Sequence, residues 1–333
     1  MEHVRLGRTG LKVSRLCLGT MTFGLQCDEP TSAAILDKAA EGGITFLDTA
    51  DVYPLGGDRT TGGRTEEIIG RWLKGKRDDF IVATKCHYPM GERPFQSGNN
   101  RRHILGAVEA SLKRLGTDYI DLYQVHSFDP ATPVEETVEA LDQVVRSGKA
   151  RYVGCSNHLA WQLARALGKS EARGLAGYVS VQPRYNLLFR EIERELLPLC
   201  LEAGVGVIPY NPIAGGMLSG KHDRSKAPPE GTRFGDVGGG RAGGMYRDRY
   251  WKDPVFDTVD QLAIVAGEAG MSLPTMAVAW TLANPAITSP IVGASRPDQL
   301  DATLAATEVK LDAALLTRLD EMTREYRRGD VGR

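Results

Sequence analysis

The sequence has little that would direct the protein to a nucleic acid or a membrane. Its 333 residues carry 41 Lys and Arg against 42 Asp and Glu, a formal net charge of −1. Because binding to a phosphate backbone needs a surplus of cations, nucleic acid is a poor candidate partner. No apolar run approaches the roughly 20 residues that a membrane helix requires. Residues 1–10 are polar and lack a signal-peptide core, so we expect a cytoplasmic protein with no membrane partner.

Cysteine is also scarce, and its spacing excludes the common cysteine-based sites. The five cysteines form no CxxC pair and no metal-finger pattern. They are Cys17, Cys27, Cys86, Cys155 and Cys200. An odd number of thiols, several within apolar runs, indicates reduced cysteines of the cytosol and no metal site.

Short apolar runs alternate with amphipathic stretches along the whole chain. Eight strand-like runs cover residues 15–18, 45–47, 81–84, 120–125, 152–153, 179–181, 205–209 and 288–291. Helix-like stretches cover residues 32–41, 65–74, 102–115, 133–146, 160–167, 192–202, 260–269, 274–283, 297–305 and 313–326. A small hairpin with its turn at Arg8-Thr9-Gly10 precedes the first run.

This alternation predicts parallel strands, because each helix returns the chain across the sheet. Eight units with no break in composition favour one (β/α)₈ TIM barrel over residues 1–333 as a single domain. An open doubly wound sheet is the alternative. Two long segments, 87–100 and 222–250, are expected as substrate-gating loops at the carboxyl-terminal face of the barrel.

Polar residues follow the apolar runs, where the active sites of such barrels lie. Four of them, Asp48, Tyr53, Lys85 and His126, suit the reduction of a carbonyl group. A tyrosine supplies a proton once a cation lowers its pKa from about 10. The buried cation needs a carboxylate, and a neutral imidazole polarises the substrate oxygen. Taken singly, each of the four has a plainer explanation as a cap, a packed aromatic or a core histidine, but together they predict a site.

The same residues carry a resemblance to a known family. Residues 47–53, Leu-Asp-Thr-Ala-Asp-Val-Tyr, resemble the D-T-A-x-x-Y signature of the aldo-keto reductases, and the runs that end at Lys85 and His126 are similar to two other strand ends of that family. The longer-loop bacterial and channel beta-subunit branch is most similar. The resemblance implies that Tyr53 is the general acid, Lys85 lowers its pKa, Asp48 pairs with Lys85, and His126 orients the carbonyl.

The resemblance also implies a nicotinamide cofactor. No GxGxxG follows the first strand, so the dinucleotide is not held in the Rossmann manner. Ser156, Asn157 and Gln182 would bind the carboxamide, and Tyr210 would stack on the nicotinamide ring. Gly19, Thr20 and Met21 follow the first strand-like run at the same end of the barrel, and we expect them to contact the cofactor as well. Residues 211–221 resemble the family's pyrophosphate loop, in which we expect contacts from Asn211, Pro212, Ile213, Ala214, Gly215, Met217, Gly220 and Lys221.

The loop after the last strand sits where barrels commonly bind phosphate. We expect Gly293 in this loop to contact the cofactor. Ser295 and Arg296 would hold the adenosine 2′-phosphate, which favours NADP (as NADPH) over NAD, and Gln299 would lie near the adenine. The family's Q-L-x-E-N reads Gln-Leu-Asp-Ala-Thr at residues 299–303, which removes two adenine contacts.

These residues predict NAD(P)H-dependent reduction of an aldehyde or ketone to an alcohol. The pocket is expected to hold Met21, Phe23, Tyr53 and Trp251 near its mouth, which suits a cyclic or aromatic carbonyl compound as the small-molecule partner. The alternative is a nucleotide-binding regulatory or interaction module with little turnover, as in the channel-associated relatives.

Overall fold

Eight parallel strands form the centre of the structure, a computed structural model that describes residues 1–235 and 241–328. They are β3 (Cys17–Gly19), β4 (Phe46–Asp48), β5 (Ile81–Cys86), β6 (Ile120–Val125), β7 (Ala150–Ser156), β8 (Tyr178–Gln182), β9 (Gly206–Val207) and β10 (Ile291–Val292). Their order is β10-β3-β4-β5-β6-β7-β8-β9. Parallel bridges Val207↔Ile287 and Tyr210↔Ile291 join the two ends of this order, the β9 segment and the β10 segment. The sheet therefore closes, which confirms the predicted barrel and excludes the open doubly wound sheet.

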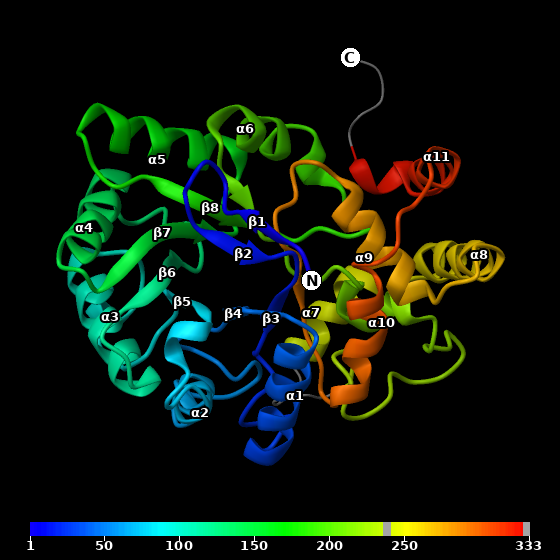
Figure 1. The fold of residues 1–333 in the computed structure, drawn as a ribbon, viewed down its shortest axis with the longest axis horizontal. Coiled ribbons are helices and arrows are strands. Elements are labelled where there is room, and N and C mark those ends of the chain that lie inside the picture. The colour runs from blue at the N-terminus through cyan, green and yellow to red at the C-terminus, as the bar shows by residue number, and fades with distance from the viewer. Residues whose placement is uncertain (236–240, 329–333) are drawn as a thin grey trace.

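Helices surround these strands as a ring (Figure 1). They are α1 (Glu29–Glu41), α2 (Arg64–Trp72), α3 (Arg101–Leu115), α4 (Val134–Arg146), α5 (Ala160–Ala172), α6 (Leu196–Ala203), α7 (Arg241–Tyr250), α8 (Asp253–Glu268), α9 (Leu273–Ala283), α10 (Leu300–Ala305) and α11 (Ala313–Met322). No single described helix is both long and apolar enough to cross a membrane. The pair α8 and α9 reaches the required length and composition together, but it bends by 90°.

Several predicted boundaries were wrong. Helices α1 and α8 begin earlier than expected, because Pro30 and Pro254 lie in their first turns, where proline is tolerated. Strands β9 and β10 are shorter than expected, since Pro209 and Pro290 have no N–H to donate to a neighbouring strand. The segment 222–250 is not a loop throughout, because its last ten residues form α7. This segment also contains three consecutive glycines, Gly238–Gly240, which the sequence predicts as part of the loop and which lie outside the described residues.

The lower part of the barrel is filled by apolar side chains. Phe46, Ala83 and Leu122 come from neighbouring strands and pack in one cluster with Leu6 and Val13. The last two belong to the predicted N-terminal hairpin, whose strands β1 (His3–Arg5) and β2 (Lys12–Ser14) pair antiparallel. Leu6 and Val13 are fully buried, so the hairpin closes the amino-terminal end of the barrel. A cavity lies at the opposite, carboxyl-terminal end.

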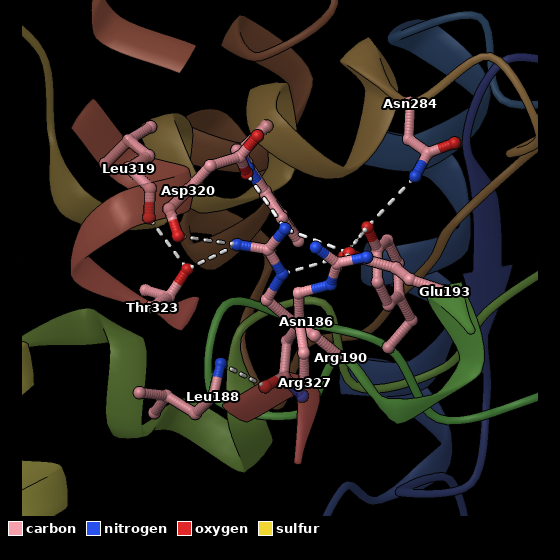
Figure 2. A network of polar contacts seen from close by, with 11 residues as sticks. Asn186, Leu188, Arg190, Glu193, Asn284, Leu319, Asp320, Thr323 and Arg327 are labelled. Carbon is pink, nitrogen blue, oxygen red and sulfur yellow. Dashed lines mark hydrogen bonds and ion pairs between the residues drawn. The ribbon is translucent and has the colours of Figure 1, made fainter. Parts of the chain in front are cut away.

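A buried polar network joins the segment after β8 to the C-terminal helices (Figure 2). The Arg190 guanidinium donates to both Glu193 carboxylate oxygens, at 2.7 and 2.9 Å, and to Thr323 Oγ1 at 2.7 Å. It also pairs with Asp320 on α11 at 3.0 Å, and Arg327 pairs with Glu193 at 3.1 Å. The Arg190 side chain is only 5% exposed, so this network fixes α11 against the barrel.

Loss of Arg190 should therefore destabilise the fold. We expect Arg190→Met to lower the free energy of unfolding by about 3 kcal/mol, near the lower end of the range for a broken buried pair, since Arg327 still contacts Glu193. Urea unfolding would measure this. Arg318→Met is the control. It removes an exposed ion pair between α11 and Glu268 at the end of α8, and it should lower the free energy of unfolding by about 1 kcal/mol or less. Equal effects of the two changes would contradict a structural role for the network.

Candidate active site

A polar layer lies directly above the apolar floor of the barrel. Side chains two residues apart on a strand point to the same face of the sheet. Phe46, Ala83 and Leu122 point inward, and so the residues two positions later, Asp48, Lys85 and Gln124, also point inward. Gln182 ends β8 at the same level. The sequence pattern thus places a carboxylate, an ammonium and two amides together inside the barrel.

Asp48 and Lys85 form a buried ion pair. Lys85 Nζ lies 2.6 Å from Asp48 Oδ1 and donates a second hydrogen bond to the Thr49 carbonyl oxygen at 2.7 Å. The other carboxylate oxygen, Asp48 Oδ2, accepts from Gln182 Nε2 at 2.8 Å and from Gln124 Nε2 at 3.3 Å. Lys85 is fully buried. Burial alone lowers its pKa, but Asp48 and Tyr53 more than offset this and raise the pKa above the usual value, so the ammonium stays charged.

Tyr53 lies against this pair. Lys85 Nζ is 5.0 Å from the centre of the Tyr53 ring. Burial raises the pKa of the Tyr53 phenol above its usual value of 10, and Lys85 opposes that increase. Lys85 thus lowers the pKa of Tyr53 as predicted, but burial raises it by more, and the net pKa lies above the usual value. At neutral pH the phenol is protonated, as a proton donor must be.

His126 completes the set. Its ring meets the Tyr53 ring edge-on, with centroids 5.7 Å apart, and it meets the Tyr88 ring in the same way at 4.9 Å. Burial, followed by the positive charge of Lys85, lowers the pKa of His126 well below 6.5. The imidazole is therefore neutral at pH 7. It can donate a hydrogen bond to a substrate oxygen while adding no second positive charge beside Lys85.

These side chains line a cavity of about 970 Å³ at the carboxyl-terminal end of the barrel. That volume is at the upper end of the roughly 300–1,000 Å³ usual for small-molecule and cofactor sites. The following predicted residues line it: Gly19, Thr20, Met21, Asp48, Tyr53, His126, Ser156, Asn157, Gln182, Tyr210, Asn211, Pro212, Ile213, Gly215, Lys221, Gly293, Ser295, Arg296 and Gln299. Lys85 lies beneath its floor. Ala214, Met217 and Gly220 are not in the lining and shape the loop from behind.

The residues expected to bind a carboxamide already hydrogen-bond one another. Asn157 Nδ2 donates to the His126 carbonyl oxygen at 2.9 Å, and Tyr210 Oη donates to Asn157 Oδ1 at 2.9 Å. Ser156 Oγ donates to the Gln182 carbonyl oxygen at 2.8 Å. These bonds fix the amides and the Tyr210 ring relative to His126. The rim of the cavity is therefore ordered by the same groups that would contact a nicotinamide.

The predicted pyrophosphate loop has an unusual backbone. Asn211, Ala214, Gly215 and Gly216 all have positive φ, at 60°, 52°, 70° and 105°. A Cβ on Gly215 would lie 2.6 Å from ring carbons of Tyr246, so only glycine allows α7 to pack this closely. Asn211 Nδ2 is buried with no hydrogen-bond partner in the described structure. Such an orphaned donor beside a glycine-lined concave backbone fits an anionic group such as pyrophosphate.

The loop after β10 also faces the cavity. Gln299 Oε1 accepts from Ser295 N at 2.8 Å, which closes the turn before α10. Arg296 is exposed and binds the Asp298 carboxylate with two hydrogen bonds of 3.1 Å. Ala302 and Thr303, which stand where the resemblance leads one to expect Glu and Asn, line the cavity as well. A phosphate at Arg296 would therefore compete with Asp298 for the same guanidinium.

Two residues expected in the pocket do not lie there. Phe23 is fully buried in the helix-facing core. Trp251 packs against Phe234, with ring centroids 5.2 Å apart, and is absent from the cavity lining. Met21 and Tyr53 do line it. The expectation for Phe23 and Trp251 was wrong, because an aromatic residue near a strand or helix end packs into the core whenever the core has room for it.

Other lining residues were missed. Tyr88, ranked below the four catalytic candidates, contacts His126 and faces the cavity. Arg233 donates to Asn211 Oδ1 at 3.1 Å, and Tyr246 and Arg249 come from α7. The pair Tyr246–Tyr250 with intervening arginines was a possible signal of an amphipathic helix in 241–250. Asp51 and His87, which are close to Asp48 and Lys85 in the sequence, do not line the cavity.

Comparisons with known proteins agree with this geometry. A family model described as the aldo/keto reductase family matches residues 15–324. An uncharacterized oxidoreductase, YrpG, of Bacillus subtilis (strain 168) is 40% identical over 97% of this chain and 96% of its own length. The versiconal hemiacetal acetate reductase of Aspergillus parasiticus is 36% identical over 96% of both chains. A probable voltage-gated potassium channel subunit beta of Arabidopsis thaliana is 37% identical over 93% of this chain and 92% of its own.

The resemblance found in the sequence is thereby confirmed. Members of this family are generally NAD(P)H-dependent carbonyl reductases. With a closed eight-stranded barrel, a family match over nearly the whole length and full-length relatives at 36–40% identity, this chain belongs to the aldo/keto reductase family and is an oxidoreductase of that family.

Proposed function

We propose that this protein reduces an aldehyde or ketone to the alcohol, with Tyr53 as the proton donor and NADPH as the reductant. One observation carries the proposal most directly. A protonated phenol, a charged ammonium and a neutral imidazole lie together at the closed end of a cavity that also carries the residues expected to bind a nicotinamide. A small carbonyl compound is the partner that this arrangement fits.

The residues present fit a nicotinamide dinucleotide. Ser156, Asn157 and Gln182 would face its carboxamide, and Tyr210 would lie along its ring. The glycine loop 211–221, with the orphaned Asn211 Nδ2, would hold the pyrophosphate. Arg296 and Ser295 would hold the 2′-phosphate that distinguishes NADP from NAD. When bound, the cofactor supplies a hydride to the carbonyl carbon.

The chain's own residues handle the proton. His126 would donate a hydrogen bond to the carbonyl oxygen and hold it near the Tyr53 hydroxyl. Tyr53 transfers its proton to that oxygen as negative charge develops there. Lys85 then stabilises the phenolate, and Asp48 keeps the ammonium charged and in place. Solvent returns the proton to Tyr53 afterwards.

A nucleotide-binding module with little turnover remains the second candidate, favoured by the similarity to the potassium channel beta subunits. The two candidates differ in turnover. Steady loss of NADPH absorbance with a panel of aldehydes and ketones supports the reductase, and tight nucleotide binding without turnover supports the module.

Tyr53→Phe tests the proton donor. This change removes one hydroxyl from a site that otherwise keeps its packing. We expect kcat to fall by about 100-fold or more, the usual contribution of a positioned acid, with the Kd for NADPH nearly unchanged. Steady-state kinetics and fluorescence titration with NADPH would measure the two quantities. Full turnover in the variant would show that another group donates the proton.

The pH profile tests the state of His126. Because burial and Lys85 lower its pKa well below 6.5, the imidazole is neutral above that lowered pKa. We expect kcat/KM to stay flat as the pH falls from 7.5 to about 5.5. A loss of activity centred near pH 6.5 would contradict this assignment if the same loss is missing from His126→Asn. A loss that persists in that variant belongs to another group.

Arg296 and Asp298 provide a matched pair for cofactor preference. Arg296→Ala should raise the Kd for NADPH several-fold and leave the Kd for NADH nearly unchanged, since only NADPH carries the 2′-phosphate. Asp298→Asn should have the opposite effect on NADPH, because it frees the guanidinium. Equal effects of Arg296→Ala on both nucleotides would exclude a role for Arg296 in binding the 2′-phosphate.

A further inference from the structure

Helix α7 presents a cation to the cavity. Arg249 lines the cavity together with Tyr88 and Tyr246. Its guanidinium is 5.9 Å from the centre of the Tyr246 ring, and within residues 1–235 and 241–328 it forms no ion pair with a carboxylate. Other partly buried arginines do form one: Arg114 pairs with Glu66 at 2.6 Å and Arg77 with Asp121 at 2.7 Å. Within the described residues, no such pair neutralises the charge that Arg249 brings to the cavity.

A second arginine lies on the neighbouring segment. Arg184, just after β8, is half-buried, and its guanidinium lies over the Phe189 ring at 3.5 Å. In the described part of the chain it too lacks an ion pair. The Glu191 carboxylate acts on Arg184 through its charge, but it pairs with Arg328 at 3.2 Å. Arg184 is not in the cavity lining, but it lies close enough to Arg249 for the two positive charges to repel each other.

A hydrogen bond between the two segments explains why the arginines are close. Asn186 Nδ2 donates to Tyr250 Oη at 3.1 Å and to the Asn211 carbonyl oxygen at 2.9 Å. Tyr250 is 1% exposed, so this contact anchors α7 against the segment after β8. Arg249 is the neighbour of Tyr250, and Arg184 lies two residues before Asn186. The fold thus brings two positive charges to one side of the rim.

The charges act on the groups that face them. Burial lowers the pKa of Arg184, and repulsion from Arg249 lowers it further, while the Tyr250 and Tyr210 phenols and Glu191 oppose this. Burial raises the pKa of Tyr210 to about 12, and both arginines counteract that rise. Burial likewise raises the pKa of Tyr88, and Arg249 opposes it. Two cations that repel each other, faced by neutral phenols, form a site that an anion would stabilise.

We propose that the substrate of this enzyme carries an anionic group, a carboxylate in the simplest case, which Arg249 binds while the carbonyl lies at Tyr53 and His126. This inference rests on the proposed function. The planar guanidinium fork matches a carboxylate in two parallel hydrogen bonds, and Arg184 adds positive charge nearby. Tyr88, which contacts His126 at one side and lies within the influence of Arg249 at the other, forms the wall between the two ends of the substrate.

Matched substrates test the proposal. 4-Carboxybenzaldehyde and its methyl ester differ in one charge, as do the 3-substituted pair. We expect Arg249→Gln to lower the ratio of kcat/KM for the acid to kcat/KM for the ester by about tenfold or more, mainly through KM, as for loss of a charge-assisted hydrogen bond. Arg249→Lys, which keeps the charge without the fork, should give an intermediate ratio.

Arg151→Gln is the control for net charge. Arg151 is exposed at the start of β7, at the opposite end of the barrel, so its removal should leave the ratio unchanged. If Arg151→Gln changes the ratio as much as Arg249→Gln does, the effect comes from long-range charge and the proposal is wrong. An unchanged ratio in Arg249→Gln overturns it directly.

Binding separates this inference from the proposed function. If the wild-type protein reduces neither aldehyde, the proposed function is in doubt, and calorimetric titration of the NADP-bound protein with the acid and the ester then decides the inference alone. Tighter binding of the acid that is lost in Arg249→Gln supports it. Equal affinity of the wild-type protein for the acid and the ester overturns it.

Discussion

The buried pair of Lys85 and Asp48 is the constraint on which the rest of the site depends. Burying an ammonium inside a barrel costs on the order of several kcal/mol in lost hydration, unless a carboxylate and further hydrogen-bond partners compensate for it. Here the Thr49 carbonyl accepts from Lys85, and two amides, Gln124 and Gln182, donate to Asp48. The layer is closed around one positive and one negative charge. A neutral His126 follows from the same requirement, because a second cation beside Lys85 would have no partner.

The barrel supports this layer by being filled below it. The N-terminal hairpin and the inward-facing apolar side chains exclude water from the amino-terminal end, and the polar groups above face the cavity at the carboxyl-terminal end. Gly154 contributes to the fit. A Cβ at that position would lie 2.5 Å from Ser180 Oγ and 3.0 Å from the Ser180 carbonyl oxygen, so glycine lets β7 and β8 pack closely beside Gln182.

Much of this architecture was predictable from the sequence because it depends on local periodicity. The eight runs follow from the alternation of strands and helices, and the inward position of Asp48 and Lys85 follows from the alternation of side chains along strands. The same pattern also fits an open sheet, and only the bridges between the two edge strands show that the sheet closes. The beginnings of α1 and α8 were missed since proline in a first turn looks like a helix breaker. Helix α7 was missed because its Gly243–Gly244 pair and its arginines read as loop residues.

Features set by tertiary packing were not predictable. The pKa of Tyr53 depends on how fully its ring is buried, and no sequence pattern gives the extent of that burial. Tyr88 and Arg233 reach the cavity only through the courses of their loops, and Phe23 turned away from it for the same reason. The sequence shows that Arg296 and Asp298 are near each other, but only the structure shows that the Asp298 carboxylate occupies the guanidinium that would bind a phosphate.

Asn186 holds one wall of the pocket independently of the buried ion pair. It touches α7 through Tyr250 and the glycine loop through the Asn211 carbonyl, whereas the ion pair of the polar layer rests entirely on the strands and the turn after β4. The segment that shapes one wall of the pocket is thus fastened to a loop, away from Asp48 and Lys85. Natural variation in that wall can retune which compounds enter while the reaction itself is inherited intact.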